Sequence, residues 1–257
     1  EFELFDSHLH IIDKRFPLQP NEGYLPDAYT CEDYLDRLSG FDLVGGAVVS
    51  GSFQAFDQSY LLAALEKLGP RFVGVTQLPV TVSDEEILRL DAKGVRAVRF
   101  NIRRGGSESL DHLSSMAHRV YDLARWHVEL YVDSRTLGSL YPALVNLPAV
   151  SIDHLGLHRE GLHYLRAAAE QGIKIKASGF GRVDFDVEPV LRELYAANPE
   201  ALMFGTDLPS TRAPVPFQDG DFERVVNTLG EHAAKQVFCA NANAFYRPEG
   251  QLPDKLS

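Results

Sequence analysis

Cysteine is scarce in this chain of 257 residues, and the two that occur, Cys31 and Cys239, lie far apart and outside any motif. This spacing predicts a chain without a disulfide framework that works in a reducing, cytoplasmic compartment. Long apolar runs are missing too, because no stretch approaches the roughly 18 residues of a membrane-spanning helix. We therefore expect no membrane segment.

Positive charge is also in short supply. The sequence holds 25 Lys and Arg residues against 36 Asp and Glu, a net charge of −11, and the acidic residues are spread along the chain. Such a surface repels phosphate backbones and anionic lipids, which argues against nucleic-acid or membrane binding. A hydrophobic content of 45% is ample for a sizeable core. The expected partner is a small molecule, and a homodimer is compatible with this composition.

A dinucleotide-binding motif is absent from the place where it would be expected. No Gly-x-Gly-x-x-Gly follows the first strand-like run, Phe5–Ile12, which carries His8 and His10 instead. On a strand, residues i and i+2 point to the same side, roughly 6.5–7 Å apart, so the two imidazoles converge. Taken alone, such a pair is more often two half-buried strand histidines, but polar residues at the ends of later strands shift the balance towards a metal or hydrolytic site.

Short apolar runs rich in β-branched residues recur about every 20–30 residues, which is the spacing of βα units. Most of them are nearly continuous, as expected of strands that are covered on both faces. They predict strands at Glu3–Ile12, Leu43–Gly51, Arg71–Leu78, Val95–Asn101, Val128–Asp133, Val150–Leu155, Ile173–Ser178 and Ala201–Asp207.

Segments with helical periodicity separate these runs, and Gly94 and Gly172 precede two strands at points where the chain needs positive φ. Strands alternating with helices in this way predict one slightly distorted (β/α)8 TIM barrel over residues 1–257. A doubly wound open sheet is the runner-up. The helices are expected at Ser59–Leu68, Ser83–Leu90, Leu110–Trp126, Leu162–Gln171, Val187–Ala197 and Phe222–Gln236.

Polar and ionisable side chains gather where the predicted strands end, which is where (β/α)8 barrels hold their active sites. Taken singly, Arg99 could pair with Asp133, Lys176 could cap a strand, and Tyr131 could belong to the core. Strand alternation would turn Asp153 outward if its neighbour points inward. Taken together they predict a site, because desolvating so many polar groups costs free energy. The set is His8, His10, Arg99, Asn101, Arg103, Arg104, Tyr131, Asp133, Asp153, His154, Lys176, Ser178, Arg182, Thr206 and Asp207. The remaining histidines are expected at the surface or in structural roles.

These motifs resemble the amidohydrolase superfamily. The resemblance rests on Asp6-Ser7-His8-Leu9-His10 at the first strand and Gly205-Thr206-Asp207-Leu208-Pro209 at the eighth. The segment Asn241–Tyr246, within residues 240–246, is similar to the helix that closes such barrels. The resemblance therefore runs over nearly the whole chain.

Within the superfamily, four segments are similar to the lactonase branch that acts on 2-pyrone-4,6-dicarboxylate: Gly23–Pro26, Val98–Asn101, Asp153–Gly156 and Lys176–Gly179. The resemblance implies hydrolysis of a small carboxylated lactone in the catabolism of aromatic compounds. It implies that Asp207 is the general base and that His8, His10 and His154 polarise the carbonyl. The residues implied to bind substrate carboxylates are Tyr24, Arg99, Arg103 or Arg104, Tyr131 and Arg182. We expect Lys176 to bind substrate as well.

Two departures from that branch concern the substrate. Leu157 stands where the pyrone-dicarboxylate enzyme has a further arginine, and Ser210 stands where many relatives have a histidine. The metal-binding members usually add a strand-five histidine or a strand-four bridging residue, where this chain has Tyr131 and Arg99. We therefore predict that no metal is required. If one is bound, zinc or manganese would be held by His8, His10, His154 and Asp207.

Two other functions stay open at the level of the sequence. The first is a metal-dependent, non-oxidative decarboxylase of an aromatic or muconate-type acid, which metal content would distinguish. The second is a barrel that binds small carboxylates without turning them over. We rank it last, because mere binding does not need this combination of three histidines and an aspartate.

Overall fold

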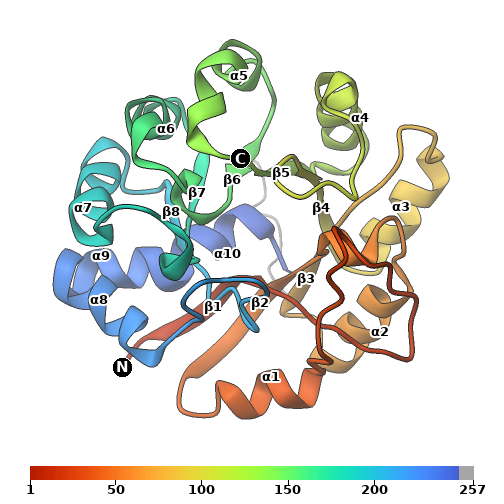
Figure 1. Ribbon diagram of the computed structural model, residues 1–257, viewed down its shortest axis with the longest axis horizontal. Coiled ribbons are helices and arrows are strands. Elements are labelled where there is room, and N and C mark those ends of the chain that lie inside the picture. Colours follow the sequence, from red (N-terminus) through yellow and green to blue (C-terminus); the bar gives the residue numbers. More distant parts are fainter. Residues whose placement is uncertain (249–257) are drawn as a thin grey trace, which may run out of the picture.

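Eight parallel strands follow one another in chain order around a single sheet, with helices outside it (Figure 1). The structure, a computed structural model, describes residues 1–248. The prediction of a (β/α)8 barrel is confirmed. The strands are β1 (Glu3–Leu9), β2 (Asp42–Val49), β3 (Phe72–Thr76), β4 (Val95–Asn101), β5 (His127–Tyr131), β6 (Val150–Ile152), β7 (Lys174–Ala177) and β8 (Leu202–Phe204).

Amphipathic helices cover the outer face of the barrel. In α7 (Val187–Ala197), the buried residues Val187, Val190, Leu191 and Leu194 recur at three- and four-residue intervals and form one apolar stripe. The other helices are α1 (Cys31–Arg37), α2 (Ser59–Leu68), α3 (Asp84–Ala92), α4 (Leu113–Ala124), α5 (Leu137–Leu144), α6 (Leu162–Glu170), α8 (Asp219–Leu229), α9 (Glu231–Lys235) and α10 (Asn241–Tyr246). None of the helices in residues 1–248 is long and apolar enough to span a membrane.

Local capping and turn signals explain several boundaries. The Ser83 side chain accepts a hydrogen bond from the Glu86 backbone N–H at 3.1 Å, so α3 begins where its sequence predicts. Gly94 and Gly172 adopt the expected positive φ, 101° and 89°. The prediction of one helix over Phe222–Gln236 is wrong, because Gly230, with a φ of 84°, ends α8 and α9 begins after it.

Two helices were missed and several strands are shorter than predicted. The missed helices are α1 and α5, and α5 contains Pro142, which obscures its pattern. Strand β6 ends at Ile152 and β8 at Phe204 because the chain turns sharply just beyond them. His154 and Asp207 have positive φ values of 51° and 59°, which no strand residue adopts.

The barrel has a seam between β8 and β1, the feature that makes it slightly distorted. The Asp6 carboxylate bridges the seam by accepting hydrogen bonds from the Thr206 backbone N–H at 2.8 Å and its hydroxyl at 2.6 Å. The Tyr34 hydroxyl also donates to Asp6, at 2.8 Å. Burial outweighs these bonds and raises the pKa of Asp6 to about 6. The Asp207 backbone N–H donates to the His8 carbonyl at 2.7 Å, so the seam itself places a predicted catalytic residue.

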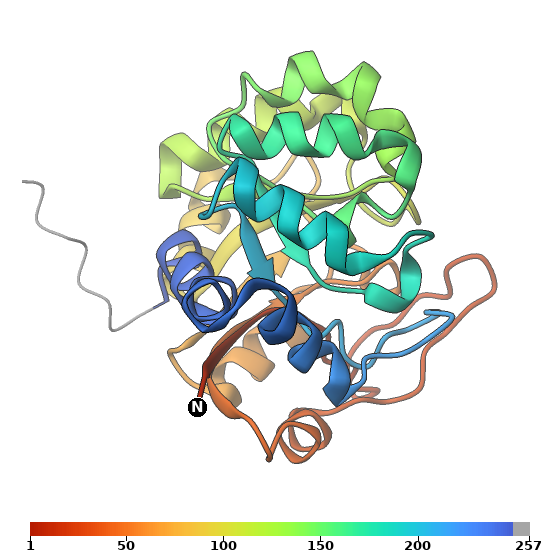
Figure 2. The ribbon, with the colours of Figure 1, turned by 90° about the vertical axis from the view of Figure 1, so that its left-hand side faces the viewer.

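The two ends of the barrel differ. Helix α10 packs against the inward-facing residues of the strands at one end, where Tyr246 is fully buried among Phe5, Val73 and Ala97. From the other end project the long segments that follow β1 and β8, which lie beside each other (Figure 2). The strand C-termini open towards these segments. The predicted site residues therefore have a common end of the barrel to occupy.

Candidate active site

His8 and His10 are held by different partners behind their rings. The Lys176 ammonium donates to His8 Nδ1 at 2.9 Å, so this nitrogen accepts and Nε2 carries the proton in the neutral ring. His10 Nδ1 lies 2.8 Å from the Val49 carbonyl oxygen, which can only accept, so Nδ1 carries the proton. His8 therefore presents a donor to the site, whereas His10 in its neutral form would present an acceptor.

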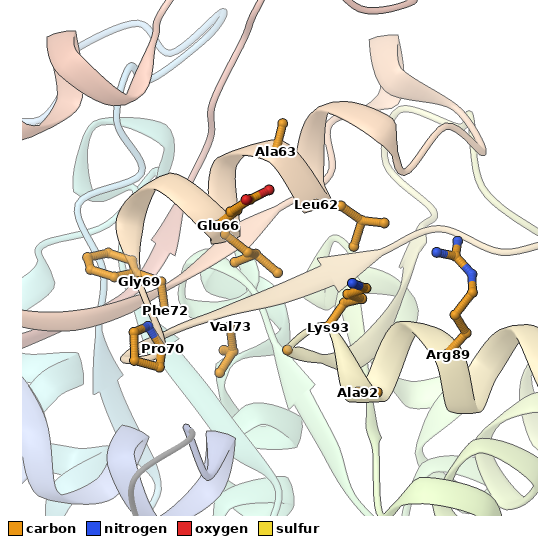
Figure 3. Close-up of a pocket in the computed structure, with 12 residues that line it drawn as sticks. Leu62, Ala63, Glu66, Gly69, Pro70, Phe72, Val73, Arg89, Ala92 and Lys93 are labelled. Carbon is orange, nitrogen blue, oxygen red and sulfur yellow. The ribbon is translucent and has the colours of Figure 1, made fainter.

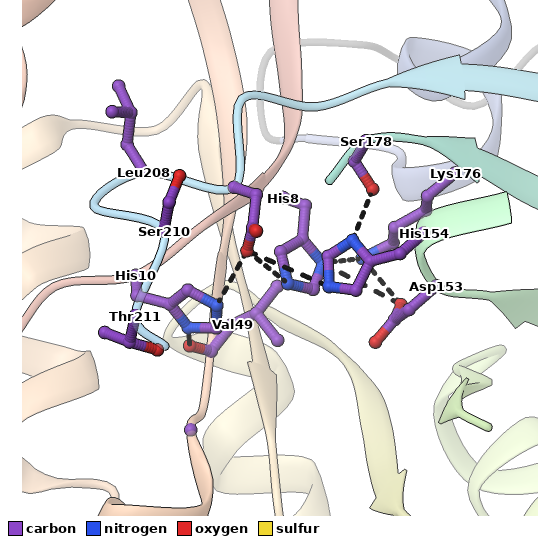
Figure 4. A network of polar contacts seen from close by, with 12 residues as sticks. His8, His10, Val49, Asp153, His154, Lys176, Ser178, Leu208, Ser210 and Thr211 are labelled. Atoms are coloured by element: carbon purple, nitrogen blue, oxygen red, sulfur yellow. Dashed lines mark hydrogen bonds and ion pairs between the residues drawn. The ribbon is translucent and has the colours of Figure 1, made fainter. Parts of the chain in front are cut away.

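Three imidazole nitrogens converge on one carboxylate oxygen (Figure 4). Asp207 Oδ1 lies 3.6 Å from Nε2 of His10 and 3.8 Å from Nε2 of both His8 and His154. His154 is oriented by a 2.8 Å hydrogen bond between its Nδ1 and the Ser178 hydroxyl. Asp207 Oδ1 is buried without a hydrogen-bond partner among the described residues. The structure thus brings together the four residues that the sequence nominated for catalysis.

The other oxygen of Asp207 is held by Arg182. Arg182 Nε donates to Asp207 Oδ2 at 2.6 Å, and Nη2 donates to the Thr211 carbonyl at 2.7 Å. Burial alone would raise the pKa of the Asp207 carboxyl, but Arg182, His154 and His10 hold it well below its usual range. Asp207 is therefore a carboxylate near neutral pH.

Burial keeps two of the three histidines neutral. It lowers the pKa of His154 to about 4, against the opposing effect of Asp207. It also lowers the pKa of His8 well below its ordinary value, and the charge of Lys176 adds to this effect. Near neutral pH, Asp207 thus lies as an anion beside the neutral imidazoles of His8 and His154, which can donate or accept hydrogen bonds.

Arg99 and Asp153 form a buried ion pair, which corrects two expectations. Arg99 Nε and Nη2 both donate to Asp153 Oδ2, at 3.2 and 2.9 Å, and Nη1 donates to the Ser50 carbonyl at 2.7 Å. Arg99 therefore does not pair with Asp133, which binds Arg135. Asp153 does not point outward, because strand β6 ends before it and alternation no longer applies.

Lys176 lies beneath His8 at the head of a buried polar network. Its ammonium binds the Glu129 carboxylate and lies 3.6 Å from Asp153 Oδ1. Glu129 also accepts from the Tyr246 hydroxyl and contacts His127 Nε2 at 2.7 Å. Burial would raise the pKa of Glu129, but Lys176 and His127 together hold it below its ordinary value. Lys176 does not line the cavity, so it contacts His8 rather than the space open to substrate.

Sequence reasoning missed Glu129, although a signal for it exists. It is the one charged residue inside the apolar run Val128–Val132, two positions after His127. A carboxylate at that position needs a buried cation, because leaving a charge buried and unpaired costs several kcal/mol. Lys176 on β7, which is likewise surrounded by apolar residues, is that cation.

A small cavity opens above the catalytic residues. Arg104 lines this cavity, whereas Arg103 is exposed and does not. Of the two arginines offered by the sequence, Arg104 is therefore the one that faces the cavity. Tyr24 lies outside the lining, under the guanidinium of Arg212. Arg212 lines the cavity and was not singled out from the sequence. The full lining is His10, Gly51, Ser52, Phe53, Arg99, Asn101, Arg104, Tyr131, His154, Arg182, Asp207, Thr211 and Arg212.

A larger hollow lies elsewhere, between α2, α3 and the beginning of β3 (Figure 3). It is lined by residues such as Leu62, Val73 and Ala92, with Glu66 and Lys93 among them. It opens at the end of the barrel opposite the strand C-termini, and none of the three histidines lines it. Size alone therefore does not identify the active site, which is identified by the chemistry of its lining.

The imidazole nitrogens and the Asp207 oxygen that face one another are also spaced so that they could hold a metal ion. Nε2 of His8 and His10 and Oδ1 of Asp207 lie within 4.8 Å of one another, and His154 Nε2 faces the same oxygen. A tetrahedral zinc ion needs ligand atoms roughly 3.3–3.5 Å apart, so separations of 3.6–3.8 Å fit after small shifts. A second group, His8, Asp153 and His154, does not fit, because Arg99 and Lys176 already neutralise its carboxylate.

The family follows from comparison of the whole chain with known proteins. The sequence model described as Amidohydrolase matches residues 5–247. The chain belongs to the amidohydrolase family. This membership confirms the resemblance inferred from the motifs, and it agrees with the prediction of a hydrolase. Members of this family often bind metals, and the residues that could hold one are present.

Curated relatives carry names of lactone hydrolases. A protein of Comamonas testosteroni named 2-pyrone-4,6-dicarboxylate hydrolase is 28% identical over 233 residues, which are 79% of this chain and 76% of the relative. A 4-sulfomuconolactone hydrolase of Rhizobium radiobacter is 25% identical over 226 residues, 80% of this chain and 75% of the relative.

Solved structures confirm the fold. A protein of Agrobacterium tumefaciens matches with a TM-score of 0.85 at 21% identity, covering 96% of each chain. A protein of Pseudomonas putida matches with a TM-score of 0.81 at 24% identity, covering 98% of this chain and all of the other.

Proposed function

We propose that this protein hydrolyses a small lactone that carries carboxylate groups, a cyclic ester like 2-pyrone-4,6-dicarboxylate. The observation that carries the proposal is the convergence of three imidazoles on the unpaired oxygen of Asp207, at the base of a cavity lined by arginines. The names of the curated relatives support the same substrate class.

In the proposed reaction, water attacks the lactone carbonyl and Asp207 takes the proton that the water loses. His154, which lines the cavity, and the Nε2–H of His8 beside it stabilise the carbonyl oxygen as it becomes the oxyanion of the tetrahedral intermediate. The bond between the carbonyl carbon and the ring oxygen then breaks. The proton held by Asp207 passes to the ring oxygen, so the ring opens to a free acid and an enol or alcohol.

The pairing of Asp207 with Arg182 makes the resting carboxylate a weak base, because the guanidinium stabilises its charge. Arg182 also lines the cavity, so a substrate carboxylate can share its guanidinium. Sharing weakens the hold of Arg182 on Asp207 and raises the basicity of the carboxylate when substrate is present. Substrate binding and activation of the base are thereby coupled.

We propose that this reaction requires no metal. Lys176 donates to Nδ1 of His8, which leaves the proton on Nε2, and a protonated nitrogen cannot coordinate a metal. The alternative is that His8, His10, His154 and Asp207 hold zinc or manganese, as a metal-dependent decarboxylase would need, and the fit of their spacing supports it. A bound ion would polarise a substrate carbonyl or carboxylate as a Lewis acid.

The test follows the absorbance of 2-pyrone-4,6-dicarboxylate mixed with protein purified without added metal or chelator, whose metal content is measured by elemental analysis. We expect ring opening at a rate that a chelator leaves unchanged, with far less than one metal ion per chain. Loss of activity with the chelator and about one zinc or manganese per chain would instead favour the metal-dependent reading. Absence of ring opening from any carboxylated lactone tried would sink the proposal.

A further inference from the structure

Arg212 reaches the cavity from the segment that follows β8. Its backbone has a φ of 59°, and its side chain is only 15% exposed. The guanidinium lies over the ring of Tyr24, 4.4 Å from the centroid, and Nη2 donates to Asn21 Oδ1 at 3.0 Å and to the Ser52 hydroxyl at 3.3 Å. These contacts fix the guanidinium at the cavity wall instead of leaving it in solvent.

A second arginine and one carboxylate complete the group. Arg104, from the segment after β4, also lines the cavity, and its backbone carbonyl accepts from Asn21 Nδ2 at 3.0 Å. A single oxygen of Glu22 lies 3.4 Å from Nη1 of Arg104 and 3.4 Å from Nη1 of Arg212. Two half-buried guanidiniums thus share one oxygen of a carboxylate that is 61% exposed.

This shared contact is weak compared with what arginine can form. A forked arginine–carboxylate pair has distances near 2.7–2.9 Å, and Arg182 binds Asp207 at 2.6 Å in the same cavity. Burial lowers the pKa of Arg212, and the nearby charge of Arg104 lowers it further. The pair therefore holds more positive charge than Glu22 neutralises, and a second anion is electrostatically favoured there.

The inner part of the cavity has less free positive charge. Arg99 is occupied by Asp153 and the Ser50 carbonyl, which leaves Arg182 as the inner guanidinium that a substrate can share. The other guanidiniums of the cavity lining belong to Arg104 and Arg212, which share the carboxylate of Glu22. These two arginines therefore supply the positive charge that a second anionic group would meet.

We propose that Arg104 and Arg212 form a second carboxylate site at the cavity mouth, which selects ring substrates with two anionic groups. Glu22 occupies this site in the free protein and is displaced when such a substrate binds. The proposal rests on the proposed lactonase function for the reaction that follows binding, but the recognition of two carboxylates is independent of ring opening.

The test measures the binding of benzene-1,3-dicarboxylate and of benzoate by titration calorimetry. Neither compound has a lactone bond, so binding is separated from hydrolysis. We expect the protein to bind the dicarboxylate at least tenfold more tightly than benzoate. Arg212→Ala should weaken dicarboxylate binding by about tenfold or more and leave benzoate binding nearly unchanged.

Glu22→Gln provides a change of opposite sign. It removes the competing carboxylate and should tighten dicarboxylate binding several-fold without affecting benzoate. Arg15→Ala is the matched control, because Arg15 lies in the same segment after β1, is 81% exposed and pairs with Asp13. We expect this control to leave both affinities unchanged. Arg212→Lys, which keeps the charge and loses the fork, should give an intermediate affinity if Arg212→Ala does not fold.

Three results would overturn the second site. The first is that the protein binds the two probes equally or binds neither. The second is that Arg212→Ala weakens the binding of both probes equally. The third is that Glu22→Gln binds the dicarboxylate more weakly, which would mean that Glu22 positions the arginines. Failure of the lactonase function has a different signature. A protein that prefers the dicarboxylate through Arg212 and opens no lactone would retain the site and lose the proposed reaction.

Discussion

At the scale of single residues, the two carboxylate oxygens of Asp207 have different surroundings. One of its oxygens is fixed by Arg182, and the other faces three imidazole nitrogens. This division assigns one oxygen to positioning and leaves the other free for proton transfer. The same division places the proton acceptor next to the groups that stabilise the oxyanion, so attack and charge stabilisation occur within one small volume.

Asp207→Asn should reduce kcat by a factor of roughly 10²–10⁴ with little change in KM, because an amide cannot accept the proton from water. The variant keeps the size of the side chain, so substrate contacts with Arg104 and Arg212 should persist. Steady-state kinetics on a lactone that the unmodified protein opens checks this. A variant with full activity would show that another group is the base.

Lys176→Met should lower the free energy of unfolding by about 3–5 kcal/mol, because it leaves the Glu129 carboxylate buried without a cation. The double variant Lys176→Met with Glu129→Gln should recover part of this loss, since the unpaired charge is then removed as well. Urea unfolding of the three proteins measures the difference. Equal stability of the single and double variants would mean that the unpaired Glu129 charge is not what lowers the free energy of unfolding.

At the scale of elements, the site depends on how the segments after the strands are anchored. Asp6 on β1 binds both the backbone and the hydroxyl of Thr206, directly before Asp207. His10 lies just beyond β1, and its Nδ1–H donates to the Val49 carbonyl at the end of β2, which fixes the orientation of the ring. Each catalytic group is therefore positioned by a neighbouring strand as well as by its own. This is possible because the strands of a barrel all end side by side.

Thr206→Val should test this anchoring. It removes the hydroxyl that donates to Asp6 at 2.6 Å and keeps the shape of the side chain. We expect a loss of about 1–3 kcal/mol in stability, because a buried carboxylate oxygen loses a donor. We also expect a fall in kcat, since the next residue is Asp207. A variant with lower stability and unchanged kcat would limit the role of the seam to folding.

At the scale of the whole molecule, buried titratable groups make stability depend on pH. Burial lowers the pKa of His8, His127 and His154, the last to about 4. Each histidine takes up a proton in the unfolded chain below about pH 6.5, but not in the folded chain until a lower pH. Their contribution to stability is thus fully present above the unfolded pKa and is lost as pH falls.

Asp6 acts in the opposite direction. Its pKa is raised to about 6 in the folded chain, so its contribution is present below the unfolded value and lost as pH rises through 6. Three histidines against one aspartate predict a net gain in stability between about pH 4 and pH 6.5. Urea unfolding midpoints at about pH 5 and pH 7 measure this gain, and a higher midpoint at pH 5 would contradict it.

The barrel could be predicted from the sequence because its signals are local. Continuous apolar runs identify strands covered on both faces, and the three- and four-residue spacing of apolar residues identifies most of the helices between them. Helix α5 escaped because Pro142 interrupts its pattern, and the strand ends were set too late because sharp turns leave little trace in hydrophobicity. The residues just beyond the strands were therefore predicted correctly as a group, but they were assigned to the strands instead of to the turns that follow them.

The sequence by itself determined the order of strands and helices and the gathering of His8, His10, His154 and Asp207 at one end, because parallel strands all end on the same side. Only the tertiary structure decided which partners these residues take. Tyr246 reaches Glu129 across 117 positions, and Arg212 reaches Glu22 across 190. Such contacts depend on the conformations of irregular segments, whose backbone follows no period that a sequence could display.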